Sequence, residues 1–314
     1  MLMSLDPALK GLLDQMAANP MPKLWEIPAA QGREMYRMMA TMLEPQNVPI
    51  GKVEDKKIPG PAGEIGIRIY SPIAQGTGPL PALVYFHGGG FVIGDLQTHD
   101  ALCRQLANEA RMRVVAVDYR LAPEHKFPAA ADDCFAAVKW VEAQASTIGV
   151  DGNRIAVAGD SAGGNLAAVV CQMAKAHGGP HIIYQVLIYP TTIAHAATPS
   201  MASFAQGYFL ERQAMDWFFD AYVPQGHDLK DPKLSPYHGE VKDLPPAYVI
   251  TAGFDPLKDE GKMYADKMAA AGVGVTYRDY PSMAHGFFNM SGVIPLASEA
   301  IKDVAAKLRL AVAN

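Results

Sequence analysis

The sequence predicts an α/β fold with a mostly parallel central sheet that is flanked by helices on both faces. From about residue 64 onward, short apolar runs alternate with longer helical patterns. The runs are apolar at nearly every position, as in strands buried on both faces of a parallel sheet. With 314 residues, half of them hydrophobic, the chain is long enough to bury one such core and still carry an insertion.

The individual elements follow from apolar periodicity and from the turn residues between the periodic segments. Strands are expected at 64–70, 82–86, 113–118, 154–158, 182–189, 247–252 and 273–280. Helices are expected at 101–110, 129–145, 162–176, 257–271 and 297–312. These elements assign 49–192 and 244–314 to the two parts of one core.

Two regions interrupt this alternation, and we expect them to pack together as a helical cap over the carboxyl edge of the sheet. The first region, 1–48, is helix-like, and the second, 193–243, holds an aromatic-rich helical pattern at 210–222 before a proline-rich end. Four methionines of the first region recur at helical spacing, which favours packing in a core over lining a pocket: Met35, Met38, Met39 and Met42.

Composition argues against several classes of function. A net charge of −5 gives no basic surface for nucleic acid or an anionic membrane, and no apolar stretch is long enough to span a bilayer. The first residues include Asp6 and Asp14 and lack a basic region, so we do not expect a signal peptide. Three cysteines without framework or metal-ligand spacing indicate reduced thiols in a cytoplasmic protein without a metal: Cys103, Cys134 and Cys171.

A serine between glycines, at the junction of an expected strand and an expected helix, is the most informative motif. The segment reads Gly159-Asp160-Ser161-Ala162-Gly163. A strand, a sharp turn carrying Ser and a helix form a nucleophile elbow, in which the hydroxyl stands clear of the sheet. The flanking glycines fit because the turn is crowded, and the N–H of Ala162 is expected to point at a developing oxyanion.

A hydroxyl needs a base, and the base needs an acid. In folds with a nucleophile elbow, these residues follow one another in the chain order Ser, acid, His. Asp255 follows the expected strand 247–252, and His285 follows the expected strand 273–280. The rival acid, Asp259, lies inside the next helical pattern. The sequence therefore predicts a triad of Ser161, Asp255 and His285.

A glycine run directly after the expected strand 82–86 predicts the second half of the site. In His87-Gly88-Gly89-Gly90, the N–H groups of Gly88 and Gly89 are expected to join Ala162 as oxyanion donors. No Lys-Ser/Thr pair follows, so the run is not a phosphate-binding loop, and its spacing does not fit a dinucleotide fingerprint. We therefore expect no cofactor.

Together these motifs are similar to those of the bacterial hormone-sensitive-lipase-like esterases, which are α/β hydrolases. They occur in the family's order: His87-Gly88-Gly89-Gly90, 118–124, 159–165, Asp255-Pro256-Leu257 and His285-Gly286-Phe287. The resemblance implies a cofactor-free carboxylesterase for short acyl chains, a cap that shapes the substrate pocket, and a homodimer. Candidate pocket residues, with cap core as the open alternative, are Tyr208, Phe209, Leu210 and Trp217.

Alternatives remain within and outside ester hydrolysis. An amidase or arylacetamide-type deacetylase uses the same triad, whereas receptors of this fold have lost the catalytic His, which His285 provides here. Asp160 and Glu124 are expected to have structural roles. In the predicted fold the last strand, 273–280, lies at the sheet edge and contains no Pro, so we expect a homodimer to form there.

Overall fold

A computed structural model describes residues 4–74 and 78–313, so residues 1–3 of the expected cap and residue 314 of the expected core lie outside the described residues. One eight-stranded sheet has the order β1-β2-β4-β3-β5-β6-β7-β8. The pairs β1·β2 and β2·β4 are antiparallel, and every other pair is parallel. The predicted fold class, a mostly parallel sheet flanked by helices, is confirmed.

The inner strands of the central sheet are buried at nearly every position because apolar side chains point to both faces. Their bounds are β1 Lys52–Gly60, β2 Gly63–Ser71, β3 Leu80–Phe86, β4 Arg113–Asp118, β5 Val150–Asp160, β6 Tyr184–Ile188, β7 Ala247–Phe254 and β8 Val275–Ala284. All seven predicted strands have a counterpart in the sheet. β8 lies at one edge of the sheet, as expected for the last strand.

The first strand, β1, has no counterpart among the predicted strands. Its sequence, Lys-Val-Glu-Asp-Lys-Lys-Ile-Pro-Gly, is mostly charged, and only Ile58 is buried. β1 is an edge strand that pairs only with β2, so most of its side chains face water and the apolar pattern that marks a strand is lost. Sequence periodicity finds buried strands and misses this exposed one.

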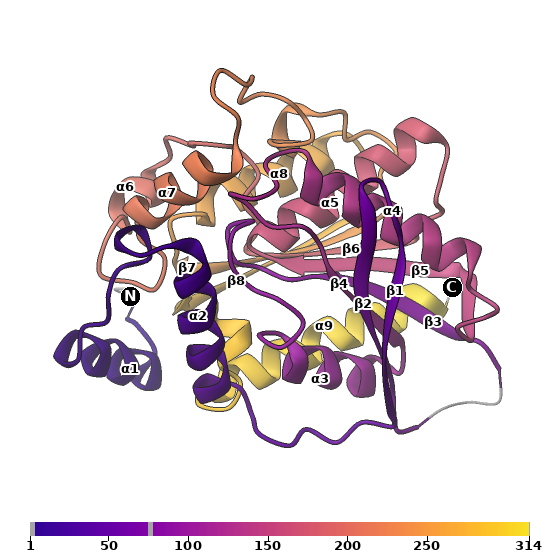
Figure 1. Ribbon diagram of the computed structural model, residues 1–314, viewed down its shortest axis with the longest axis horizontal. Coiled ribbons are helices and arrows are strands. Elements are labelled where there is room, and N and C mark those ends of the chain that lie inside the picture. The colour runs from indigo at the N-terminus through magenta and orange to yellow at the C-terminus, as the bar shows by residue number, and fades with distance from the viewer. Residues whose placement is uncertain (1–3, 75–77, 314) are drawn as a thin grey trace.

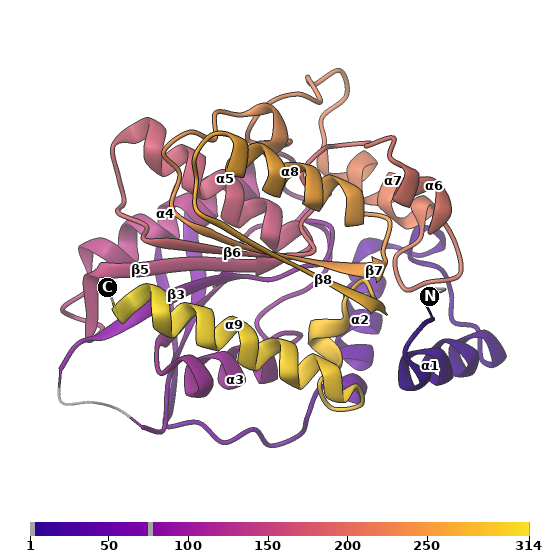
Figure 2. The ribbon, with the colours of Figure 1, turned by 180° about the vertical axis from the view of Figure 1, so that it is seen from behind.

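Helices cover both faces of the sheet, with α4, α5 and α8 on one face and α3 and α9 on the other (Figures 1 and 2). Their bounds are α3 Asp100–Ala110, α4 Ala129–Ala143, α5 Ala162–His177, α8 Lys258–Ala270 and α9 Pro295–Ala313. The five predicted core helices therefore match to within a few residues. Two buried apolar clusters, one on each face, form the core.

The two interrupting segments lie at the same end of the sheet in both ribbon views (Figures 1 and 2). The N-terminal segment holds α1 Pro7–Ala18 and α2 Ala29–Leu43, and the second holds α6 Pro199–Ser203 and α7 Arg212–Tyr222. We refer to residues 4–48 and 193–243 together as the cap. Within the described residues, no helix is both long and apolar enough to cross a membrane.

Candidate active site

The turn between β5 and α5 carries Ser161 in a strained conformation. Its φ of 56° and ψ of −118° lie outside the regions that side chains favour, and such strain is typical of a nucleophile elbow. A Cβ on Gly159 would lie 2.2 Å from the carbonyl oxygen of Gly163, and one on Gly163 would lie 1.9 Å from that of Phe86. Only glycine fits at either position, which is why the flanking glycines are required.

Three side chains from three strand ends form one hydrogen-bonded line. The Ser161 hydroxyl lies 2.9 Å from Nε2 of His285, and Nδ1 of His285 lies 2.8 Å from Oδ2 of Asp255. Asp255 directly follows β7, and His285 directly follows β8. Because parallel strands bring their carboxyl ends to one edge of the sheet, residues 124 positions apart meet there.

Burial and a second hydrogen bond orient the carboxylate of Asp255. Asp255 has no exposed surface, and its Oδ1 accepts the N–H of Leu257 at 2.8 Å, which leaves Oδ2 for His285. The rival Asp259 points elsewhere, because its carboxylate accepts the N–H of Ser200 at the start of α6. The structure thus brings together the three residues chosen from the sequence and leaves Asp259 outside.

The glycine loop after β3 requires one correction. Gly88 was predicted to donate to an oxyanion, but its N–H donates to Oδ1 of Asp160 at 3.0 Å and also lies 3.4 Å from Nε2 of His99. Gly89 and Gly90 line the cavity above Ser161, with φ of +120° and +58°. Within the described part of the chain, the N–H groups of Gly89, Gly90 and Ala162 have no protein acceptor. The free donors are therefore these three, and Gly90 replaces Gly88.

Contacts from behind hold the glycine loop in place. His87 stacks on Tyr119 with ring centroids 4.2 Å apart, and the Tyr119 hydroxyl donates to the carbonyl of His87 at 2.7 Å. Burial lowers the pKa of His87 to about 4, so this ring is neutral at neutral pH. On the cap side, Arg33 pairs with Glu124 and donates to the carbonyl of Val92. Through Arg33, Glu124 thus links α2 of the cap to the chain that follows the glycine loop.

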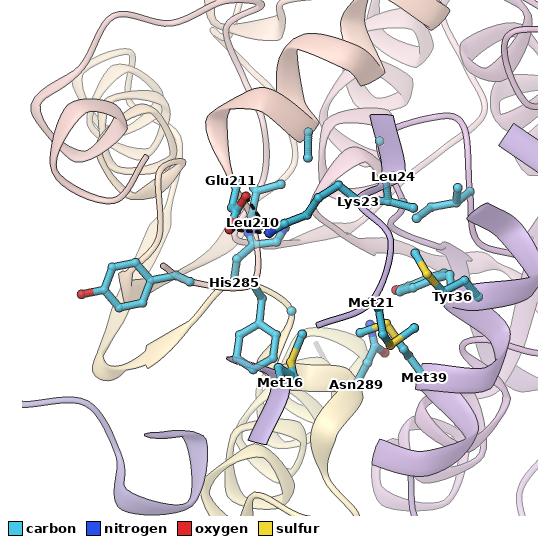
Figure 3. Close-up of a pocket in the computed structure, with 18 of the residues that line it drawn as sticks. Met16, Met21, Lys23, Leu24, Tyr36, Met39, Leu210, Glu211, His285 and Asn289 are labelled. Carbon is cyan, nitrogen blue, oxygen red and sulfur yellow. Dashed lines mark hydrogen bonds and ion pairs between the residues drawn. The ribbon is translucent and has the colours of Figure 1, made fainter. Parts of the chain in front are cut away.

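The triad opens into a cavity of about 430 Å³ that both parts of the cap and the core line together (Figure 3). Tyr208, Phe209 and Leu210 belong to this lining, and Trp217 does not. Trp217 lies one position before Phe218 on α7, so its indole faces a different side of that helix. It is partly buried and packs against the core, with its ring centroid 5.2 Å from that of Phe218. The prediction that Trp217 lines the pocket is corrected to Phe218.

The methionine stripe of α2 also differs from its prediction as core. Met38 and Met42 are 55% and 75% exposed, whereas Met35 and Met39 line the cavity. Sequence reasoning assigned none of the N-terminal lining residues to the pocket, because periodicity does not distinguish a cavity from a core. The lining residues with large apolar groups in this segment include Met16, Met21, Leu24, Met35, Tyr36 and Met39.

The two parts of the cap meet at the cavity through one ion pair. Lys23 pairs with both carboxylate oxygens of Glu211 at 3.1 and 3.2 Å, and both side chains line the cavity (Figure 3). No other ion pair joins the two cap segments over residues 4–48 and 193–243. Within the described residues, no group of three or more His, Cys, Asp or Glu side chains is arranged to hold a metal ion.

The fold and the strand-end position of this cavity define the class of the protein, which is an α/β hydrolase. A family model, Abhydrolase_3, described as alpha/beta hydrolase fold, matches residues 83–289. The chain belongs to this family and, within it, to the hormone-sensitive-lipase-like carboxylic ester hydrolases.

Relatives in this group are similar over nearly the whole chain. "Esterase LipI" of Mycobacterium tuberculosis is 43% identical over 98% of this chain and 95% of its own length. The crystal structure of a Ser-to-Ala mutant of LAE6, an alpha/beta hydrolase enzyme from the metagenome of Lake Arreo, Spain, is 44% identical with a TM-score of 0.96, over 99% of each chain. A hyperthermophilic esterase from Pyrobaculum calidifontis is 42% identical with a TM-score of 0.93, over 98% of this chain and 99% of its own.

Proposed function

We propose that this chain is a serine carboxylesterase that hydrolyses short-chain acyl esters through an acyl-enzyme. The observation that carries the proposal is the continuous line from Ser161 through His285 to Asp255, with contacts of 2.9 and 2.8 Å. A serine hydroxyl at this distance from an imidazole is within reach of proton transfer. No metal or cofactor enters the proposed reaction.

Each residue of the line has one role in the proposed reaction. The Ser161 oxygen attacks the ester carbonyl carbon while Nε2 of His285 takes the hydroxyl proton. The same proton passes to the leaving alkoxide, which departs as the alcohol and leaves an acyl-Ser161 ester. Water then attacks this ester with His285 as base, and the products are the acid and the free serine. Asp255 holds the tautomer and stabilises the imidazolium.

The oxyanion is assigned to the three free backbone donors. Gly89, Gly90 and Ala162 have N–H groups without protein acceptors beside Ser161, within the chain that the structure describes. Losing one such donor typically costs about 2.7–4 kcal/mol of barrier, so three fixed donors account for much of the rate. Glycine at the first two positions lets the loop turn its N–H groups inward.

The cavity supports a preference for short acyl chains. Its volume of about 430 Å³ is shared between the acyl and alcohol parts of the ester, and large apolar side chains close it. A series of p-nitrophenyl esters from C2 to C16 tests this directly. Catalytic efficiency is expected to be highest between about C2 and C8, and a palmitate ester that outperforms the butyrate ester contradicts the proposal.

A second readout separates esterase from the alternatives. An amidase or arylacetamide-type deacetylase is expected to cleave anilides at rates comparable to matched esters, and an esterase is expected to prefer the ester strongly. A ligand-binding receptor of the same fold is expected to cleave neither. A Ser161→Ala control distinguishes turnover by the triad from background hydrolysis.

We also propose a homodimer through the exposed edge of β8. β8 pairs with β7 on one side only, and Thr276 and Arg278 are exposed on this edge strand. An antiparallel pair of β8 strands about a two-fold axis, over the part of β8 before Pro281, would satisfy the free backbone groups of both edges. Light scattering is expected to give a dimer for the wild type and a monomer for Val275→Pro. Lys56→Pro on β1, at the opposite edge, is the matched control and should remain dimeric.

A further inference from the structure

The residue before the nucleophile, Asp160, connects all three loops of the proposed site. Its carboxylate is 2% exposed and accepts the Gly88 N–H at 3.0 Å, the Tyr85 hydroxyl at 2.8 Å and the Asn289 amide at 3.3 Å. Gly88 belongs to the glycine loop, and Asn289 follows His285 on the next turn. One buried carboxylate thus holds the elbow, the glycine loop and the histidine loop together.

A buried histidine, His99, completes this group. Its Nε2 lies 3.2 Å from Oδ1 and 3.3 Å from Oδ2 of Asp160, and the ring is 1% exposed at the start of α3. The Asn289 amide nitrogen lies 3.1 Å from the same Nε2, so both groups converge on the carboxylate. Asn289 and Asp160 also line the cavity, as Figure 3 shows for Asn289.

The hydrogen-bond partners of both ring nitrogens allow this ring to carry a charge. The Thr98 hydroxyl lies 2.9 Å from both the carbonyl oxygen of Asp95 and Nδ1 of His99, and when its one proton goes to Asp95, Nδ1 can donate to the hydroxyl oxygen. Nε2 faces a carboxylate, which accepts but does not donate when ionised. The N–H of Gly88 also lies 3.4 Å from Nε2. With Thr98 donating to Asp95 and Nε2 donating to the carboxylate, both ring nitrogens would carry protons and His99 would be an imidazolium.

The surrounding charges agree with this assignment. Asp160 raises the pKa of His99, and His99 helps to lower the pKa of Asp160 to about 2 despite burial. The other carboxyl groups that face His99 are Asp95, which pairs with Arg37, and Glu44, whose pKa burial raises to about 8. His87 faces it as a neutral ring, and Tyr36 and Tyr85 are neutral phenols. A positive charge on His99 would therefore be matched by the carboxylate of Asp160.

We propose that His99 is protonated and that its ion pair with Asp160 is a positioning device that orients the glycine loop toward the oxyanion and leaves no net charge behind it. A lone carboxylate at this place would oppose the negative charge that develops on the substrate oxygen. An apolar residue at position 160 would leave the Gly88 N–H without its acceptor. The paired arrangement supplies the acceptor and neutralises its charge. This proposal rests on the proposed ester hydrolysis.

The test compares variants that remove the two halves of the pair. His99→Gln keeps the carboxylate and removes its counter-charge, so kcat on a butyrate ester is expected to fall about 10- to 100-fold with KM nearly unchanged. Asp160→Asn keeps an acceptor for Gly88 and removes the charge, so it should lose less than about tenfold. The double variant should resemble Asp160→Asn and exceed His99→Gln in activity. Tyr85→Phe, which removes a neutral hydrogen bond to the same carboxylate, is the matched control and should lose only a few fold.

A transition-state analogue distinguishes positioning from general structural support. A butyryl trifluoromethyl ketone places an anionic oxygen at the three free donors, so its inhibition constant should rise in His99→Gln by the same factor as kcat falls. A loss of kcat without weaker inhibition overturns the proposal, as does a double variant no better than His99→Gln. If His99→Gln does not fold, Asp160→Asn decides, and a loss beyond about tenfold overturns the proposal. A wild type inactive on esters would instead contradict the proposed function.

Discussion

The cap and the floor of the cavity, by which we mean the loops at the strand ends that carry Asp160, Ser161, Asp255 and His285, hold their side chains by different means. On the floor, Asp160 and Asp255 are almost fully buried, and each makes several hydrogen bonds to loops that the sheet fixes. In the cap, flexible methionines line the cavity, and Lys23 and Glu211 form the joining ion pair with 48% and 22% of their side chains exposed. An exposed pair of this kind contributes about 0.2–1 kcal/mol.

This difference separates the chemistry from the choice of substrate. Proton transfer and oxyanion binding depend on geometry held to a fraction of an ångström, and hydrogen-bonded carboxylates on strand ends provide it. Methionine has several low-energy rotamers and adapts to varied apolar shapes. We therefore expect changes on the floor to reduce kcat for all esters, and changes in the cap to alter the ranking among esters.

The largest effect is expected for the proposed nucleophile and base on the floor. Ser161→Ala and His285→Ala should each reduce kcat by about 10⁴–10⁶, and the double variant should be no slower than either single variant because the residues act as a unit. Initial rates on p-nitrophenyl butyrate measure this, with circular dichroism as the check on folding. A double variant much slower than both single variants would show that the two residues act independently.

The acid of the line should give the next largest effect. Asp255→Asn leaves a hydrogen-bonding group of the same shape but favours the wrong tautomer of His285, so kcat should fall by roughly 10⁴. Asp259→Asn, four residues on, removes a charge that caps α6 in the cap. It should change kcat by less than tenfold. Equal losses in the two variants would assign Asp255 a structural role.

A cap variant should move substrate preference and leave the chemistry intact. Met39→Ala enlarges the cavity, so the ratio of catalytic efficiencies for octanoate and butyrate esters should rise by up to about tenfold. The reason is that burial of each added methylene contributes about 0.8 kcal/mol of binding free energy. Met38→Ala, on the exposed side of the same helix, is the control and should leave the ratio unchanged. An equal fall in catalytic efficiency for all esters in Met39→Ala would show that Met39 supports the chemistry and not the choice of substrate.

The same contrast explains what the sequence could predict. Ser161, Asp255 and His285 follow strands in a fixed chain order, so local motifs were enough to select them and the structure brings them together. The partner of Gly88 was not predictable, because its acceptor lies 72 residues away.

The cap was less predictable than the floor. Met39 and Met42 share one helix and one helical spacing, yet one lines the cavity and the other faces water. That outcome depends on where the insertion packs, and local patterns do not contain this information. β1 was missed for a related reason, since an edge strand needs no apolar alternation.

Where the floor meets the cap, Glu260 gives the smallest predicted effect, in stability. This carboxyl on α8 is fully buried, accepts the N–H of Thr192 at 2.6 Å where the chain enters the cap, and has no partner for Oε2. Burial raises its pKa from 4.5 to about 8. The folded state therefore keeps this proton between about pH 4.5 and 8 while the unfolded chain releases it. The stabilising contribution is complete below about pH 4.5 and is lost as the pH rises through about 8.

Glu260→Gln keeps the acceptor and removes the titration, so its melting temperature should fall less than that of the wild type between pH 5 and pH 9. Glu44, whose pKa burial also raises to about 8, remains in both proteins, so the wild-type decline should shrink without vanishing. Glu109→Gln on the exposed surface of α3 is the control and should follow the wild type at every pH. A melting difference between Glu260→Gln and wild type that is the same at pH 5 and pH 9 would mean that Glu260 is ionised in the folded protein. The junction would then depend on a buried carboxylate like that of Asp160 on the floor, and not on a neutral hydrogen bond.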